Sequence, residues 1–239
     1  MTHPIPPATI QKFHVKGGPA AGRKALPLLR AVLQAQRLDG FLIPHEDEYN
    51  NEYVPESADR LAWATGFTGS AGAAIVMKDR AAIFTDGRYT LQVRSQVDGD
   101  LFAFEGFPEP GIAGWIAAHA RKGEAIGYDP RLHTPDAIAR IETAAASAGV
   151  TLKAVEVNLV DLAWTDRPPA PMATIRPHAA ELTGKAHGEK IDALARTLSA
   201  DGVDAAVITD PASVAWAFNI RGGDVACTPL PLGRAIILA

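Results

Sequence analysis

GAAIVMKDRAAIFTDGRYT, residues 72–90, gives the strongest indication of the fold that we expect for this chain. Two apolar runs, GAAIVMK and AAIFTD, lie on either side of a charged turn, which predicts two strands of a β-hairpin. The second run breaks at Asp86-Gly87, a turn signal, and RYTLQVRSQV after it predicts a helix. The stretch therefore predicts strand, strand and helix, and it places Arg88 where the second strand ends.

The same alternation extends outward from this hairpin. Before it, LRAVLQAQRL predicts a helix that stops at Asp39-Gly40, FLIP a strand and DRLAWATGF a helix. After it, LFAFE, AIGYD and TLKAVEV predict strands, with helices at GIAGWIAAHAR and TPDAIARIETAAASAG. Thr134 is the expected N-cap of the last helix, with Pro135 at its first position and Gly149 past its end. Six strands and about as many helices predict a layered α/β domain with a mixed sheet.

A later region repeats the beginning of this pattern. LRAVLQAQRLDGFLIP, which starts at Leu29, aligns without gaps on LARTLSADGVDAAVIT, which starts at Leu194. In each copy a segment with tryptophan follows, Trp63 in LAW and Trp216 in VAW, and then an apolar strand, AAIVM or AIILA. We therefore expect two copies of one α/β unit, the first complete and the second interrupted.

Composition sets the expected domain boundaries. Residues 1–23, rich in proline and glycine, predict an irregular arm of a first domain that covers 1–165. The prolines of TDRPPAPMATIRPH exclude a helix and a central strand, so 166–185 are expected to be a linker. Residues 186–239 then start the second copy, whose strand AIILA lacks the partner that AAIFT gives in the first. Because an unpaired apolar strand is a poor natural terminus, we expect the chain to be a fragment.

Bulk composition excludes several classes of protein. The 239 residues, 47% of them hydrophobic, can form one large or two smaller packed domains. The net charge of -4, with lysine and arginine scattered, argues against a nucleic-acid partner. The single Cys227 excludes an internal disulfide and a cysteine-based zinc site, which fits a reducing compartment. No run approaches about 18 apolar residues and no signal peptide is evident, so we expect a cytoplasmic protein without a membrane partner.

Two loops resemble functional motifs but predict plain structure. Gly66, Gly69 and Gly72 in GFTGSAG lack phosphate-loop spacing and lead into a strand, so we expect them to shape a tight loop. Ser70 between them lacks the G-x-S-x-G elbow of a hydrolase nucleophile. HEDEYNNEYVPE gathers acids around a histidine without helical metal-ligand spacing, so a solvated loop is favoured over a metal site. No metal site is expected in this chain.

The residues alone leave two interpretations of Arg88 even. In the first, Gly87 supplies an unusual backbone angle after Asp86, and Arg88 is merely exposed in the first turn of the helix. In the second, Arg88 meets a carboxylate of the protein or of a ligand. A cation at a helix N-terminus opposes the helix dipole, and an arginine fork binds carboxylates bidentately.

Four stretches, GFTGSAGAAIV, FTDGRYTLQ, NLVDLAWTDRP and VAWAFNIRGGDV, resemble the Xaa-Pro aminopeptidases, or aminopeptidase P, of the long type with two creatinase-like N-terminal domains. The resemblance runs from about residue 26 to 239 and matches the N-terminal portion only. It implies a six-stranded mixed sheet flanked by helices, a related second domain, and a C-terminal pita-bread metallohydrolase domain beyond these residues. In the family that domain binds two divalent metal ions, usually manganese, and removes the N-terminal residue when proline is second.

The resemblance also implies roles within this chain. Arg88 of TDGRY would contact the Xaa-Pro peptide, whereas catalytic residues and metal ligands would lie outside the chain, leaving it inactive alone. WTDRP matches the exit from the first domain, and Gly223 stands where the commoner form has serine. The chain would position substrate and contribute contacts of a homodimer. Site-shaping roles fall on Asp86, Gly87, Tyr89, Arg221 and Asp224.

Two alternatives stay open. Prolidase and creatinase carry related N-terminal domains, although the duplicated unit with TDGRY and WTDRP favours the aminopeptidase. A catalytically inactive relative would use such domains to bind histones or peptides. Metal ligands in the residues after 239, two Asp, one His and two Glu, would separate an enzyme from a binding module.

Overall fold

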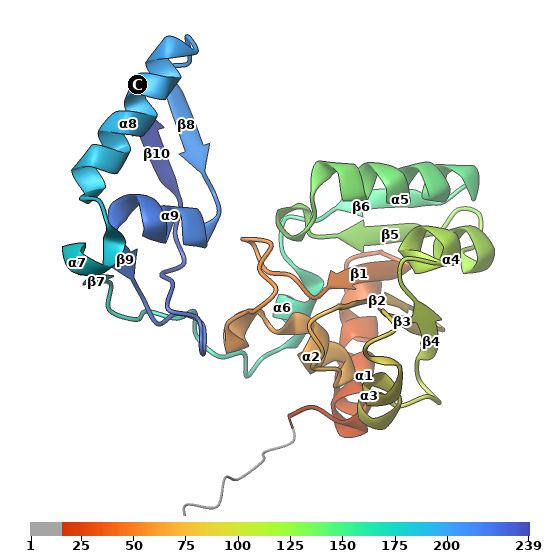
Figure 1. Cartoon of the computed structure of the whole chain (residues 1–239). Coiled ribbons are helices and arrows are strands. Elements are labelled where there is room, and N and C mark those ends of the chain that lie inside the picture. Colours follow the sequence, from red (N-terminus) through yellow and green to blue (C-terminus); the bar gives the residue numbers. More distant parts are fainter. Residues whose placement is uncertain (1–15) are drawn as a thin grey trace, which may run out of the picture.

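The structure, a computed structural model, describes residues 16–239 and contains a larger α/β unit and a smaller one (Figure 1). The larger unit consists of α1 (Pro19–Ala35), β1 (Gly40–Pro44), η1 (Glu56–Ala58), α2 (Arg60–Thr65), β2 (Gly72–Met77), β3 (Ala81–Thr85), α3 (Thr90–Gln96), β4 (Ala103–Gly106), α4 (Gly111–His119), β5 (Ala125–Tyr128), η2 (Pro130–Leu132), α5 (Pro135–Ser147), β6 (Thr151–Ala154) and α6 (Leu159–Ala163). After it come β7 (Arg176–Pro177), α7 (Ala180–Thr183), α8 (His187–Ala200), β8 (Ala205–Ile208), α9 (Pro211–Phe218), β9 (Ile220–Arg221) and β10 (Ala235–Leu238).

The larger unit has a six-stranded mixed sheet in the order β4-β3-β2-β1-β5-β6. β2 runs antiparallel to both β1 and β3, whereas β4 is parallel to β3, and β5 and β6 continue parallel from β1. The predicted hairpin and the α/β fold class are therefore confirmed. Because only β2 runs the other way, the carboxyl ends of the other five strands share one edge of the sheet with the start of β2.

Helices cover both faces of this sheet. On one face, leucines of α1 such as Leu29 and Leu33 pack on Phe41 and Val76 of the strands. On the other face, α4 and α5 cover a second cluster of buried apolar residues, which includes Ile75. Burying each such side chain contributes about 1.5–3 kcal/mol, so the two clusters account for much of the stability of this unit.

α1 begins earlier than expected. The predicted irregular arm over 1–23 is wrong for its last five residues, because α1 starts at Pro19; residues 1–15 lie outside the described part. Proline suits the first turn of a helix, where its missing N–H would have no partner. Gly22 allows close packing, since a Cβ there would lie 3.0 Å from the Phe102 ring.

The expected linker is tied to the smaller unit over its second half. β7 pairs with β9, and the His178 amide donates to the Asn219 carbonyl oxygen at 2.7 Å. Pro177 lies in β7, which is one strand of a short two-stranded ladder. Proline is tolerated in such an edge strand. The domain boundaries at 165 and 185 stay predictions.

The smaller unit repeats the order helix, strand, helix, strand. β8 and β10 are antiparallel, as β1 and β2 are, and α8 lies beside them as α1 lies beside the larger sheet (Figure 1). The register shows one difference from the expected match of AAIVM with AIILA. Phe41 lies opposite Val76, and its counterpart Ala206 lies opposite Ile237 rather than Leu238.

Arg234 links the two units. Its Nη2 donates to the Glu48 carbonyl oxygen at 2.8 Å, and its guanidinium lies 4.5 Å from the centroid of the Tyr49 ring.

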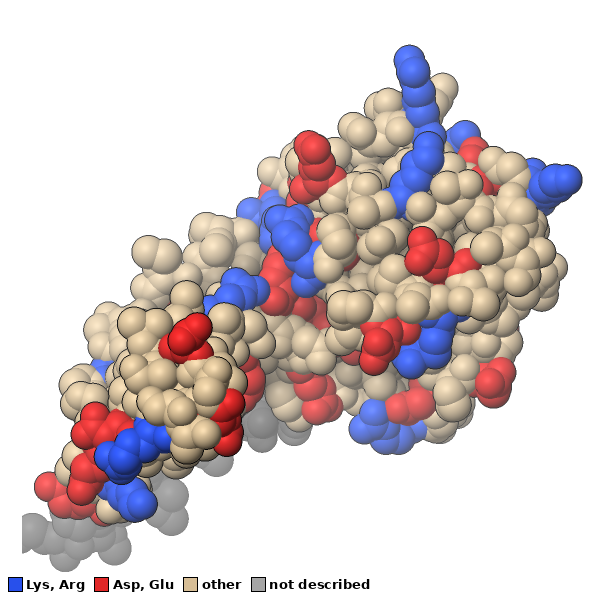
Figure 2. All heavy atoms as spheres, turned by 90° about the horizontal axis from the view of Figure 1, so that it is seen from above, with Lys and Arg blue, Asp and Glu red and all other residues tan. Residues whose placement is uncertain are grey.

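On the face shown in Figure 2, basic and acidic side chains are interspersed rather than gathered by sign. Within residues 16–239, every helix is too short or too polar to span a bilayer.

Candidate functional site

Three loops meet where β3 ends. The loop after β1, the loop before β2 and the loop between β3 and α3 reach the same edge of the sheet because β2 runs against its neighbours. Ser70 Oγ donates to Glu52 Oε1 at 2.7 Å and lies 2.9 Å from Tyr89 Oη. The Arg88 guanidinium lies 5.3 Å from the centroid of the Tyr89 ring. Arg88 thus belongs to a small polar cluster with Glu52, Ser70 and Tyr89.

Asp86 holds the Arg88 side chain. Arg88 Nε lies 3.0 Å and Nη2 2.7 Å from Asp86 Oδ2, and the Arg88 amide donates to Oδ1 at 2.9 Å. Hydrogen bonds from the Arg88 side chain and amide hold the pKa of Asp86 below its usual value. The guanidinium is 65% exposed, and its Nη1 makes no hydrogen bond to residues 16–239. The carboxylate that Arg88 meets is therefore that of Asp86, two residues earlier in the chain. The guanidinium stays exposed, and its Nη1 is free to donate a hydrogen bond.

Gly87 differs from its expected role. Its φ lies outside the left-handed range, so the prediction of an unusual backbone angle is wrong. The Asp86 side chain closes the turn instead, by accepting the Arg88 amide two residues on. A Cβ on Gly87 would meet no atom within 4 Å, so nothing in residues 16–239 requires glycine here. The backbone beside Arg88 is open to a ligand or to another part of the protein.

The glycine-rich loop is tight, as predicted. Gly66 ends α2 with a φ of 89°, a conformation that glycine adopts without strain. A Cβ on Gly69 would lie 2.7 Å from the Tyr89 ring, so this glycine lets the loop approach the Arg88 segment closely. Ser70 contributes its hydroxyl to the cluster through the contacts with Glu52 and Tyr89.

The acidic loop after β1 is less solvated than expected. Asp47 is 1% exposed and accepts hydrogen bonds from the Tyr49 and Asn51 amides, and the buried His45 donates through Nε2 to the Glu52 carbonyl oxygen at 2.6 Å. These bonds fix the loop and bring Glu52 to Ser70. Within residues 16–239 no three His, Cys, Asp or Glu side chains lie together as metal ligands would.

A buried arginine that the sequence did not reveal holds the exit of the larger unit. Arg60 is 2% exposed, and it donates to Asp161 at 2.8 Å and to Glu48 at 2.7 Å. Burial alone would lower the pKa of Arg60, but these two carboxylates outweigh it and raise that pKa. Arg167 of WTDRP also pairs with Asp161, at 2.6 Å, and Trp164 stacks on the Trp63 ring. The WTDRP motif therefore fixes the end of the larger unit against α6 and α2.

Arg221 and Asp224 lie in the smaller unit, away from the Arg88 cluster. Asp224 accepts from the Ala173 amide at 3.0 Å and from the Leu232 amide at 2.7 Å, which fixes its loop. Arg221 Nη1 donates to the carbonyl oxygen of Ile220. No hydrogen bond within the described residues joins either side chain to the segment 86–89. A Cβ on Gly223 would lie at an ordinary 3.6 Å from that of Ala173, so this departure from serine is mild.

Comparisons with known proteins agree with this architecture. Residues 26–161 and 166–239 each match a family described as Creatinase/Prolidase N-terminal domain. Probable Xaa-Pro aminopeptidase P of Ajellomyces capsulatus is 36% identical over 92% of this chain and 36% of its own length. The same enzyme of Aspergillus niger is 36% identical over 89% of this chain and 35% of its own length. The chain thus spans about a third of these relatives.

Among solved structures, the chain is similar to the X-prolyl aminopeptidase of Caenorhabditis elegans, described as a cytosolic enzyme with a di-nuclear active site. The TM-score is 0.83 and the identity 29%, over 91% of this chain and 37% of that one. The resemblance inferred from TDGRY and WTDRP is therefore confirmed. With two consecutive copies of the fold and a match to the N-terminal portion of aminopeptidase P, the chain belongs to the creatinase/prolidase N-terminal domain family.

Proposed function

We propose that this chain is the N-terminal part of a metal-dependent Xaa-Pro aminopeptidase and that it positions the peptide rather than cleaving it. The observation that carries the proposal is Arg88, an exposed guanidinium fixed by Asp86 with Nη1 free. A fork held in this way can donate to a carbonyl or carboxylate oxygen of a peptide without first losing side-chain freedom. The open backbone at Gly87 would let that peptide approach.

The described residues do not fit a di-nuclear metal site, because no cluster of three potential ligands is found among residues 16–239. Two divalent ions, manganese in our proposal, would polarise the peptide carbonyl and supply a hydroxide from another part of the protein. The contribution of this chain is then to orient the peptide, with Tyr89 and Glu52 fixing the loop beside Arg88. We further propose a homodimer in the cytoplasm, as the resemblance implies.

The test uses the longer protein that contains this chain. Arg88→Ala is expected to lower kcat/KM for an Xaa-Pro peptide by about 10- to 100-fold, equivalent to roughly 1.4–2.7 kcal/mol of transition-state binding. Arg88→Lys should recover only part, since a point charge cannot reproduce a planar fork. Arg94→Ala, an exposed arginine of α3 without an ion pair in the described residues, is the matched control.

Unchanged kinetics in Arg88→Ala, or a loss explained by a lower Tm, would overturn the proposal. The 239-residue chain alone, assayed with excess manganese, serves as the blank. Turnover proportional to its concentration would place the catalytic centre within the chain.

A further inference from the structure

A cavity of about 790 Å³ lies at the carboxyl edge of the six-stranded sheet. The ends of β1 and β3, the start of β2, the segment after β4 and the helices α4 and α5 line it. Ligands of open α/β sheets bind in such crevices outside the carboxyl ends of strands. The volume falls in the range of about 300–1,000 Å³ that is typical of small-ligand pockets. Both position and size therefore suit a binding site.

The wall of the cavity is largely apolar. Phe107, Ile112 and Ile141 contribute large apolar side chains, and Ala137 of α5 contributes a small one. Proline residues on the segment after β4 extend this apolar wall. A ligand would bury apolar groups here at about 25 cal/mol per Å².

His133 adds an unsatisfied polar group. It lines the cavity, and its Nε2 is buried without a hydrogen-bond partner among residues 16–239. Burial lowers the pKa of His133 to about 4, so the ring is neutral near pH 7. An unpartnered buried nitrogen costs about 1–3 kcal/mol, a cost that a hydrogen bond from a ligand or a water would remove.

Three of the four charged residues that line the cavity have no ion pair within residues 16–239. Glu46, Glu109 and Arg140 all line it, yet none of them has an ion pair within the described residues. Asp86 is already engaged by Arg88. Two free carboxylates and one free guanidinium complement a ligand that carries a basic group and a carboxylate together with apolar surface.

Asp86 connects the cavity to the proposed substrate contact, since the same side chain lines the cavity and holds Arg88. A peptide held by Arg88 would pass the mouth of the cavity. We propose, resting on the proposed function above, that the cavity binds the part of the peptide beyond proline and favours an apolar residue followed by a basic C-terminal residue. Glu46 and Glu109 would attract the basic group, and Arg140 the terminal carboxylate.

The first experiment uses the 239-residue chain and NMR. Titration with the peptide Ala-Pro-Phe-Arg should shift the His133 ring and the Ile112 and Ile141 methyl signals, with Kd in the low millimolar range. Ala-Pro-Phe-Glu should bind about tenfold more weakly, because its last side chain is negative where that of Ala-Pro-Phe-Arg is positive. Ala137→Leu should abolish the shifts by filling the cavity, whereas Ala139→Leu, on the exposed side of the same helix, should keep them.

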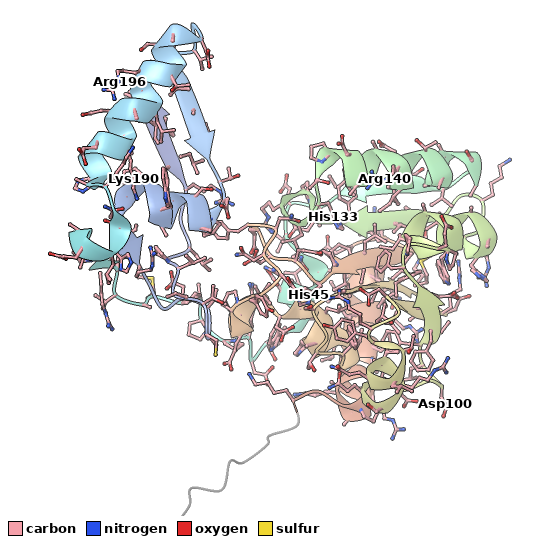
Figure 3. The ribbon with its side chains drawn as sticks, viewed as in Figure 1. His45, Asp100, His133, Arg140, Lys190 and Arg196 are labelled. Atoms are coloured by element: carbon pink, nitrogen blue, oxygen red, sulfur yellow. The ribbon has the colours of Figure 1, made fainter. Side chains whose placement is uncertain are left out.

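Arg140→Ala should weaken binding of Ala-Pro-Phe-Arg about tenfold, whereas Arg196→Ala should not. Figure 3 shows Arg140 on α5 and Arg196 on α8 of the other unit. Equal binding of the two peptides, absence of shifts at saturating peptide, or shifts that survive Ala137→Leu would overturn the proposal.

A second experiment separates this proposal from the proposed function. In the longer protein, Ala137→Leu should lower kcat/KM about tenfold for Ala-Pro-Phe-Arg and leave Ala-Pro-Ala unchanged, whereas Arg88→Ala should lower both. If Arg88→Ala acts on both peptides but Ala137→Leu leaves their ratio unchanged, the cavity proposal alone fails. If Arg88→Ala changes neither peptide while the NMR shifts persist, the proposed role of Arg88 fails and the cavity remains a peptide site.

Discussion

The two units of the chain differ in what covers the sheet face opposite their first helix. In the larger unit α4 and α5 bury that face completely. In the smaller unit the matching positions are more than 60% exposed. The pairs, matched by strand register, are Leu42 with Val207, Ile75 with Ile236, and Met77 with Leu238. One element pattern thus gives a closed core only where helices cover both faces, so the smaller unit is expected to be less stable.

The first helices also differ. The alignment of Leu29 with Leu194 matches Ala25, buried in the larger unit, with Lys190 in the smaller one. Lys190 is 5% exposed, and its Nζ donates to the Trp216 carbonyl oxygen at 2.9 Å and to Asn219 Oδ1 at 2.7 Å. A buried ammonium is costly unless hydrogen-bonded. The smaller unit therefore joins its two helices by polar contacts where the larger unit uses apolar packing.

The largest expected effect concerns the buried ions of the larger unit. Asp161→Ala would leave the buried Arg60 with Glu48 as its one remaining carboxylate partner among the described residues. The Nη1 of Arg60 already lacks a hydrogen-bond partner among these residues. Removing one member of a buried ion pair costs about 3–5 kcal/mol, and we expect that loss in the free energy of unfolding. Urea denaturation followed by tryptophan fluorescence in a Trp216→Phe background reports on the larger unit alone, which holds the other three tryptophans.

The control for this prediction is Asp166→Ala. Asp166 pairs with Lys24 at 3.6 Å with both side chains about 70% exposed, and exposed pairs contribute about 0–1 kcal/mol. A loss in Asp161→Ala no larger than in the control would show that Glu48 alone satisfies Arg60.

A matched pair of isoleucines tests the difference in coverage directly. Ile75→Ala should cost about 2–4 kcal/mol in the larger unit, because the side chain is fully buried between strands and helices. Ile236→Ala should cost less than about 0.5 kcal/mol, because that side chain is 65% exposed. Urea transitions of the two units, with Trp216 reporting on the smaller, give both values. Similar losses at the two positions would mean that the β8–β10 face is covered in solution.

Acid should weaken the larger unit through His133. Its pKa is lowered from 6.5 to about 4 by burial, so between these values the unfolded chain binds the proton and the folded unit does not. Stability from this group is therefore complete above about pH 6.5 and is lost as the pH falls toward 4, by about 3 kcal/mol. His133→Gln should remove that part of the pH dependence. If the variant and the original chain lose stability in parallel over this range, the imidazole is not the cause.

The fold was predictable because its signals are local. The Thr134 cap is confirmed, with its hydroxyl accepting from the Ala137 amide at 3.3 Å, and the leucine spacing that predicted α1 holds. The Arg88 cluster was only partly predictable, since Glu52 and Ser70 come from loops that meet Tyr89 through the sheet topology alone. Arg60 gave no signal, because an arginine in the first turn of a helix is usually exposed. Gly87 was misjudged because a side-chain turn replaced the expected backbone angle.

Two glycines, one in each unit, carry the smallest expected effect. A Cβ on Gly222 would lie 2.6 Å from the backbone nitrogen of Pro231, so Gly222→Ala must displace the loop and should cost about 1–3 kcal/mol in the smaller unit. Gly87→Ala meets no atom within 4 Å and needs no left-handed φ, so it should be neutral or stabilise the larger unit by up to about 1 kcal/mol. Thermal unfolding of the 239-residue chain measures both. A destabilised Gly87→Ala would show that the turn at Arg88 needs glycine for its own structure. A stable variant whose longer protein binds Xaa-Pro peptides more weakly would mean that the space beside Arg88 is kept for the peptide, since nothing else within residues 16–239 fills it.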